Sequence, residues 1–151
     1  MNIRDTFKNS LKGDKLDNAL GLVDFLLNKG LNPIQEWEHG VRFVKNEKSP
    51  CLIFTIPESG EWVICDLPVA SEPEWNSLCN VLQEFVIANI KICSVHEGNS
   101  CGCGSEPGLS KTIFANDYSN VCTSEIQIVN PGDDDLDKFK KIIEWWVNCA
   151  C

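Results

Sequence analysis

Apolar residues recur at helical spacing in three separate stretches of this 151-residue chain, and short strand-like segments lie between them. The three stretches are residues 14–29, 71–89 and 133–147. Side chains three and four positions apart share one face of a helix, and an apolar face must be buried against another element. A chain with this pattern has to supply a sheet that covers its amphipathic helices.

Residues 14–29 are predicted to form the first helix, with Asp14 as its N-cap and Gly30 as the residue that ends it. The apolar stripe of this helix consists of Leu16, Ala19, Leu20, Val23, Leu26 and Leu27. The preceding residues 1–13 are rich in Lys, Asn and Asp, and we expect them to form a loosely held arm.

Three short segments rich in β-branched and aromatic residues follow, at residues 41–45, 51–56 and 62–66. The breaks between them contain residues that favour turns, so the segments are predicted to form a three-stranded meander. Their apolar residues do not alternate cleanly with polar ones. We therefore expect part of this sheet to be covered on both faces.

Residues 71–74, Ser-Glu-Pro-Glu, match a capping box with proline in the first helical turn. The second helix is predicted to begin there and to run to about Asn89. Its core stripe consists of Trp75, Leu78, Cys79, Leu82, Phe85 and Val86. This spacing predicts one continuous helix.

Residues 90–95 are then predicted to form a strand that leads into a loop containing glycine and cysteine at residues 97–110. Two further strands are predicted at residues 112–115 and 125–129, and the turn Asn-Pro-Gly at 130–132 follows them. The last helix begins with three consecutive carboxylates, which complement the positive end of a helix dipole. Its buried stripe is predicted to be Leu136, Phe139, Ile143, Trp146 and Val147.

The predicted order is helix, three strands, helix, two or three strands, helix. Strands and helices do not alternate one for one, so we predict an α+β fold on a mainly antiparallel sheet, in one domain that spans residues 1–151. The same order in a small acidic chain is similar to the specialised secretion-chaperone fold, whose members bind stretches of partner polypeptide. That resemblance implies a chaperone-like binding role.

The formal net charge of −9 restricts the classes of partner. It repels the phosphate backbone of nucleic acids and the surface of anionic lipid, so neither is an expected partner. A negative field favours cations or a basic protein surface, although acidity also serves to keep a protein soluble. The oligomeric state is not readable from these features.

Several features indicate the reducing cytoplasm. No apolar run approaches the roughly 18 residues of a membrane-spanning helix, and the first residues contain no apolar stretch typical of a signal peptide. Nine cysteines are an odd number and too few for a disulfide scaffold in a chain of this length. We therefore expect a soluble cytoplasmic protein that is neither exported nor embedded in a membrane.

Two Cys-X-Cys pairs indicate a site. The first is Cys101 and Cys103 in the 97–110 loop, and the second is Cys149 and Cys151. Gly102 and the glycine after Cys103 can adopt positive φ and bend the backbone so that both thiols of the first pair converge. Tetrahedral zinc requires such convergence, because its Zn–S bonds are about 2.3 Å long.

Further ligands are available in the sequence. His96 and Cys122 are candidates for the third and fourth positions around zinc. Cys149 and Cys151 are an alternative source of thiolates, provided that the last helix stops near Asn148. We therefore predict a zinc site formed by Cys101 and Cys103 with His96, Cys122 or the second pair, and its role is open.

Two alternatives to the zinc site stay open. The cysteine pairs are unliganded if the protein is a non-enzymatic acidic interaction module, either chaperone-like or an inhibitor of a basic partner. A thiol-redox protein is the third reading, but the flanking carboxylates oppose thiolate formation. The sequence contains no recognisable catalytic constellation, so we favour a non-enzymatic role without excluding an enzyme.

Overall fold

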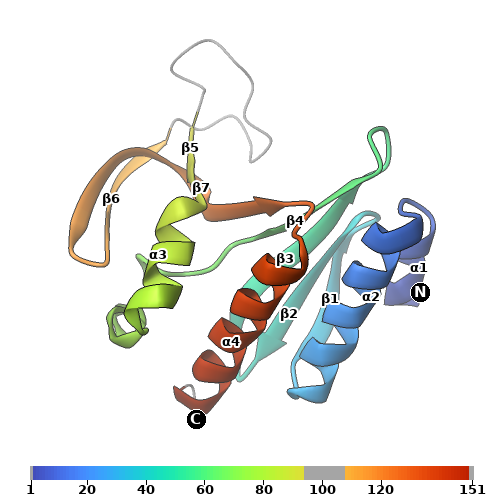
Figure 1. Ribbon diagram of the computed structural model, residues 1–151, viewed down its shortest axis with the longest axis horizontal. Coiled ribbons are helices and arrows are strands. Elements are labelled where there is room, and N and C mark those ends of the chain that lie inside the picture. Colours follow the sequence, from blue (N-terminus) through green and yellow to red (C-terminus); the bar gives the residue numbers. More distant parts are fainter. Residues whose placement is uncertain (1, 94–107, 150–151) are drawn as a thin grey trace. The chain divides into compact units, whose positions relative to one another are not determined.

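An antiparallel meander forms the sheet of the first of two units in the computed structural model, which describes residues 2–93 and 108–149 (Figure 1). This unit comprises the described residues up to Ile64 and from Ile128 onward. The order along its sheet is β1-β2-β3-β4, and the end of β7 lies next to β4. The bounds of its strands are Asn32–Trp37 (β1), Gly40–Lys45 (β2), Lys48–Ile56 (β3) and Glu61–Cys65 (β4).

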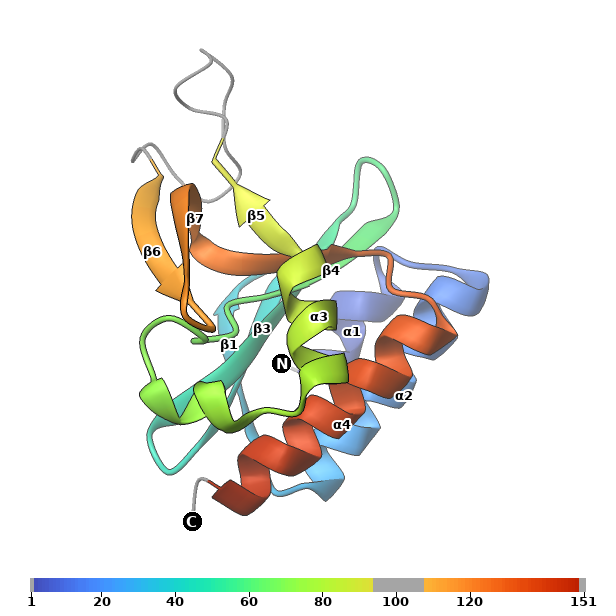
Figure 2. The same cartoon turned by 60° about the vertical axis from the view of Figure 1, so that its left-hand side comes forward.

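Helices cover one face of this sheet. Figures 1 and 2 show α2 and α4 side by side over the strands. The core between helices and sheet contains fully buried side chains from both layers, among them Leu22 and Leu26 of α2 and Phe139 of α4. The helices of this unit are Ile3–Lys8 (α1), Gly13–Asn28 (α2) and Asp133–Cys149 (α4).

The second unit runs from Cys65 to Gln127. Its long strand β7 pairs antiparallel with both β5 and β6. Asn120 and Glu125 have φ of 57° and 59°, and these left-handed residues interrupt the regular extension of β7. The elements of this unit are Pro73–Ser77 (η1), Asn80–Ala88 (α3), Ile90–Ile92 (β5), Leu109–Ile113 (β6) and Asn116–Val129 (β7), whose last residues belong to the first unit.

The α+β class and the order of elements are as predicted, with two additions before the meander. The first addition is α1, where a loosely held arm was expected. Asn2 accepts a hydrogen bond from the Arg4 N–H and caps this helix, while Phe7 and Leu11 are buried in the core at 0% and 2% exposure. Burial of these two apolar residues holds the segment in place.

The second addition is β1. Its six residues include Pro33 and only two large apolar side chains, so the strand pattern is weak. Proline lacks an N–H, and it is tolerated here because β1 lies at one end of the strand order among the described strands. Pro33 pairs with Phe43 of β2 in the register of the sheet.

The prediction of one continuous helix over residues 71–89 is wrong. This stretch is split into η1 and α3, because Leu78 and Cys79 are extended, with ψ of 141° and 153°. The capping box does not form either, since the Ser71 hydroxyl lies 3.5 Å from a carboxylate oxygen of Glu125. At the first helix the N-cap is Lys12 and not Asp14, which lies in the first turn of α2.

None of the described helices is long and apolar enough to span a membrane.

Candidate functional site

The predicted zinc ligands fall mostly outside the described residues. His96, Cys101, Cys103 and Cys151 lie outside them, and Cys149 is described only as the last residue of α4, without its side chain. The helix ends at Cys149, one residue after Asn148, near which it had to stop for Cys149 and Cys151 to act together. Cys122 is the one predicted ligand whose side chain the structure describes.

Cys122 lies in the middle of β7 and is fully buried, at 0% exposure. The Ser124 hydroxyl donates a hydrogen bond to its sulfur across 3.3 Å, and Gln127 donates in turn to the Ser124 oxygen across 3.2 Å. These contacts fix the orientation of the Ser124 hydroxyl against the sulfur. A buried thiol with a local donor is suited to packing or to ligation after loss of its proton.

The two described residues that flank segment 94–107 pack against each other. The Cys93 N–H donates to the Asn120 carbonyl across 2.6 Å. A Cβ added to Gly108 would lie 2.5 Å from the Asn120 carbonyl carbon and 2.7 Å from the Cys93 Cβ, so only glycine fits there. The described residues on either side of segment 94–107 therefore both contact Asn120, which is two positions before Cys122 in β7.

Cys93 is a buried cysteine that is not among the predicted zinc ligands. It is 4% exposed, and its Cβ lies next to Gly108, the described residue at the other end of segment 94–107. Cysteine content alone could not single it out, because four cysteines have similar apolar neighbours. Among the described side chains, no group of three or more His, Cys, Asp or Glu residues is arranged to hold a metal ion.

A buried ion pair lies in the same unit and was not predicted. The Glu125 side chain is 5% exposed and its carboxylate lies 2.8 Å from the Lys111 ammonium nitrogen. The Ala70 N–H donates to the other carboxylate oxygen across 3.1 Å. One carboxylate therefore joins β6, β7 and the segment that precedes η1. The only feature of the sequence that indicated this ion pair is the position of a charged residue, Glu125, in the predicted strand at residues 125–129.

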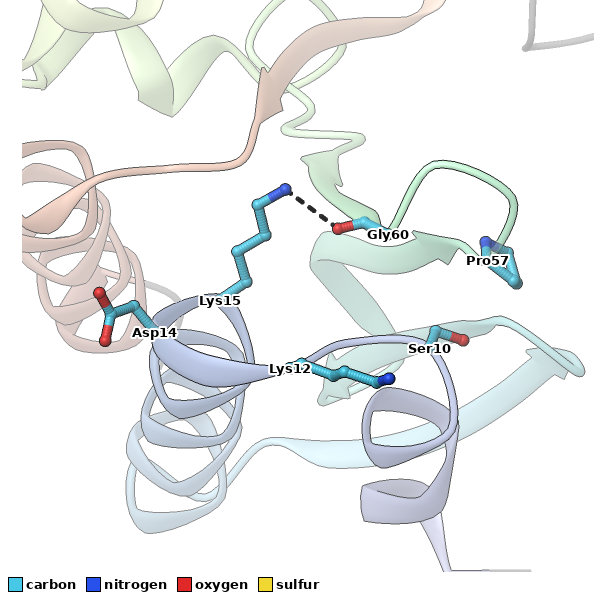
Figure 3. Close-up of a pocket in the computed structure, with 6 residues that line it drawn as sticks. All are labelled: Ser10, Lys12, Asp14, Lys15, Pro57 and Gly60. Atoms are coloured by element: carbon cyan, nitrogen blue, oxygen red, sulfur yellow. Dashed lines mark hydrogen bonds between the residues drawn. The ribbon is translucent and has the colours of Figure 1, made fainter.

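A depression of about 600 Å³ lies between the start of α2 and the β3–β4 turn (Figure 3). Lys15 donates from its ammonium group to the Gly60 carbonyl across 3.1 Å, and Lys12 lies on the opposite side of Lys15 from Asp14. All of the lining residues are exposed or half-buried. The two lysines favour an anion, but no buried polar group points to a particular ligand.

Carboxylates gather where α2 lies beside α4. Asp14, Asp17, Asp133 and Asp137 line two shallow depressions of about 300 and 460 Å³ in this unit. Asp137 is paired with Lys141 one helical turn away, as the neighbouring Asp134 is with Lys138. Lys140 also lines one of the depressions, but Asp14, Asp17 and Asp133 outnumber it and make this groove acidic.

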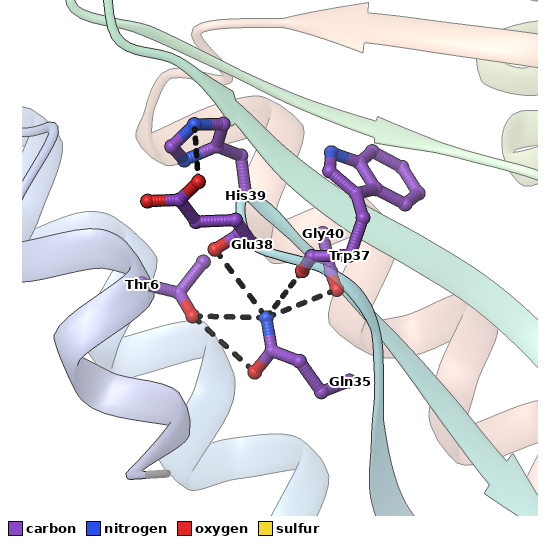
Figure 4. A network of polar contacts seen from close by, with 6 residues as sticks. All are labelled: Thr6, Gln35, Trp37, Glu38, His39 and Gly40. Atoms are coloured by element: carbon purple, nitrogen blue, oxygen red, sulfur yellow. Dashed lines mark hydrogen bonds and ion pairs between the residues drawn. The ribbon is translucent and has the colours of Figure 1, made fainter.

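The turn between β1 and β2 is held by one amide side chain (Figure 4). The Gln35 Nε2 lies 2.6 Å from the Trp37 carbonyl oxygen, 3.3 Å from that of Gly40 and 3.2 Å from the Thr6 hydroxyl. His39 lies in this turn, with its Nε2 3.8 Å from a Glu38 carboxylate oxygen. The turn is thus rigid in its backbone while its Trp37 side chain is 45% exposed.

Comparison with protein-family models, curated proteins and solved structures finds no match for this chain. The resemblance of its element order to secretion chaperones accordingly stays a prediction.

Proposed function

We propose that the protein binds a metal ion, zinc by its ligand chemistry, through Cys101 and Cys103. The observation that carries this proposal is the closed base of the loop. Cys93 and Gly108 meet on Asn120, close along β7 to Cys122. The joined ends of this segment support a ligand set that combines Cys101 and Cys103 with Cys122.

The choice of zinc follows from the donors. Thiolate sulfur and imidazole nitrogen are the ligands that zinc takes in four-coordinate sites. Cys101, Cys103 and Cys122 supply three thiolates, and His96 or the pair Cys149 and Cys151 would complete the set. The net charge of −9 favours binding of a cation, and the same field opposes the reactive thiolate that a redox protein needs.

The test is elemental analysis of protein purified without added metal. We expect about one equivalent of zinc in the wild type and its loss in Cys101→Ser/Cys103→Ser. Cys79→Ser is the matched control, since Cys79 is an exposed cysteine at the N-cap of α3 and its replacement should leave the zinc content unchanged. Less than about a tenth of an equivalent of any transition metal in the wild type would refute the proposal.

A second function is favoured by the acidic groove between α2 and α4. We propose that the protein also acts as a non-enzymatic interaction module for a basic polypeptide, with Asp17 and Asp133 among the carboxylates that attract it. Charge complementarity of this kind accelerates association and selects against acidic partners. Lys12 and Lys15 on the adjoining surface are the groups that such a partner has to avoid.

The second function is tested by titrating the protein with octa-arginine and with octaglutamate at two salt concentrations. We expect binding of octa-arginine only, weakened by salt and by the double reversal Asp17→Lys/Asp133→Lys. The matched control is Glu47→Lys/Glu144→Lys, which changes the net charge equally in the same unit, near Lys29 at the other end of α2. Equal loss in both double variants would show that net charge alone is responsible and would contradict a defined groove.

A further inference from the structure

The exposed indole at the β1–β2 turn has a chemistry that fits the proposed basic partner. We propose that Trp37 is the contact point for a Lys or Arg side chain of a basic polypeptide segment. This inference rests on the second proposed function and names a surface through which it would act. It is independent of the zinc site.

Trp37 is the only aromatic residue among the large hydrophobic side chains that are exposed in the described part of the chain. Its exposure of 45% leaves a large apolar surface in water. Tryptophan is the residue type that most often dominates the energy of protein interfaces, and an exposed, fixed tryptophan is typical of a binding surface.

The indole ring of Trp37 packs against Gly40. A Cβ added to Gly40 would lie 2.5 Å from Trp37 Cη2 and 2.6 Å from both Cζ2 and Cζ3. The six-membered ring therefore lies directly on the backbone of Gly40. Phe54 of β3 supports it from the side, with ring centroids 5.9 Å apart and a 45° angle between the planes.

The backbone beneath the ring is fixed as well. Gln35 is within hydrogen-bonding distance of the carbonyls of Trp37 and Gly40, which are the two ends of the turn. Thr6 of α1 anchors the same amide group. Side chains held in their bound position lose little conformational entropy on binding, so this arrangement favours affinity.

The charge around Trp37 determines the chemistry of the partner. Of its two acidic neighbours in the chain, Glu36 is paired with Arg42 across 2.7 Å, whereas the Glu38 side chain is 83% exposed and open to a partner. The face of an indole ring attracts cations, and nearby carboxylates add to that attraction. A basic segment is therefore attracted, whereas an acidic segment or a phosphate backbone is repelled.

The experiment follows the five tryptophan indole N–H signals of ¹⁵N-labelled protein during titration with octa-arginine. The signal of Trp37 is assigned with Trp37→Phe. We expect it to shift most among the five, and we expect Trp37→Ala to weaken binding by about tenfold. Gly40→Ala should weaken binding also, because its methyl group displaces the indole while φ at this position suits any residue.

Val129→Ala is the matched control, because Val129 is 51% exposed in the same unit and its two neighbours in the chain, Ile128 and Asn130, are uncharged. Its affinity should stay within about twofold of the wild type. Circular dichroism checks that each variant is folded. Binding that is unchanged in both Trp37→Ala and Gly40→Ala would overturn this surface and leave the second function intact. Absence of octa-arginine binding to the wild type would overturn both.

Discussion

The buried Glu125 is the residue with the most demanding surroundings in the described structure. Its carboxylate is almost completely removed from water, and its backbone φ of 59° is in the left-handed region, which costs about 1 kcal/mol for a residue with a Cβ. Three groups offset this cost, namely the Lys111 ammonium, the Ala70 N–H and the Ser71 hydroxyl. Removal of any one partner leaves charge or a polar group without compensation.

We predict that Glu125→Gln lowers the free energy of unfolding by about 3–5 kcal/mol, because Lys111 is then left as a buried, uncompensated charge. The double variant Glu125→Gln/Lys111→Met should recover most of that loss, since it removes both charges. Chemical denaturation of the two single variants and the double variant measures this coupling. Additive effects of the two changes would show that the ion pair contributes nothing specific.

Thr55 of β3 presents a different case at the residue scale. Among the described side chains, its hydroxyl is the buried oxygen without a hydrogen-bond partner. Thr55→Val keeps the shape and removes the desolvated hydroxyl, so we expect stability to rise by about 1 kcal/mol. Thr55→Ser, which keeps the hydroxyl and deletes the methyl group, should lower it. Thermal unfolding compares the pair, and destabilisation by valine would reveal a partner for this hydroxyl.

At the scale of elements, the split between η1 and α3 shows a local signal overruled by tertiary contacts. Ser71 and Glu74 have the right types and spacing for a capping box, but Ser71 is used by Glu125, a residue far away in the sequence. The apolar stripe at helical spacing was real, because Trp75, Leu78 and Leu82 are all buried. The stripe predicted the buried residues except Cys79, which is exposed, and missed the extended residues at the junction.

This junction provides a prediction about α3. Its N-cap is Cys79, which makes no hydrogen bond from its side chain to the first turn. Cys79→Asp should stabilise the protein by about 1 kcal/mol, because an aspartate accepts from an N–H of the first turn and complements the helix dipole. Chemical denaturation measures the gain, with Cys79→Ala as the control that removes sulfur without adding a cap. Equal stability of both variants would contradict a free N-cap.

The elements α1 and β1 illustrate what periodicity does not detect. Six residues are too few to show a helical or strand period, and both elements depend on contacts with distant parts of the chain. Thr6 and Gln35 connect the two across 29 positions. A short element of this kind is stable only because its neighbours bury Phe7 and Leu11.

On the scale of the whole molecule, a metal bound to segments far apart in sequence would add stability only to the loaded protein. We predict that chelation lowers the melting temperature of the zinc-loaded wild type by about 5–10 °C, which corresponds to ligand at about 100 times its dissociation constant. Cys101→Ser/Cys103→Ser should melt at one temperature with or without chelator. A chelator response of equal size in that variant would place the metal elsewhere.

The sequence by itself determined the fold class, the positions of the main helices and strands, and most of the core. Apolar periodicity is a local property, and burial of an apolar face follows wherever that face is covered. Only the tertiary structure decided the partners of Glu125, the support of Trp37 by Phe54, and the contact between Cys93 and Gly108 that closes the loop base. Each of these depends on residues that are distant in the chain and adjacent in space, and no local pattern records such distances.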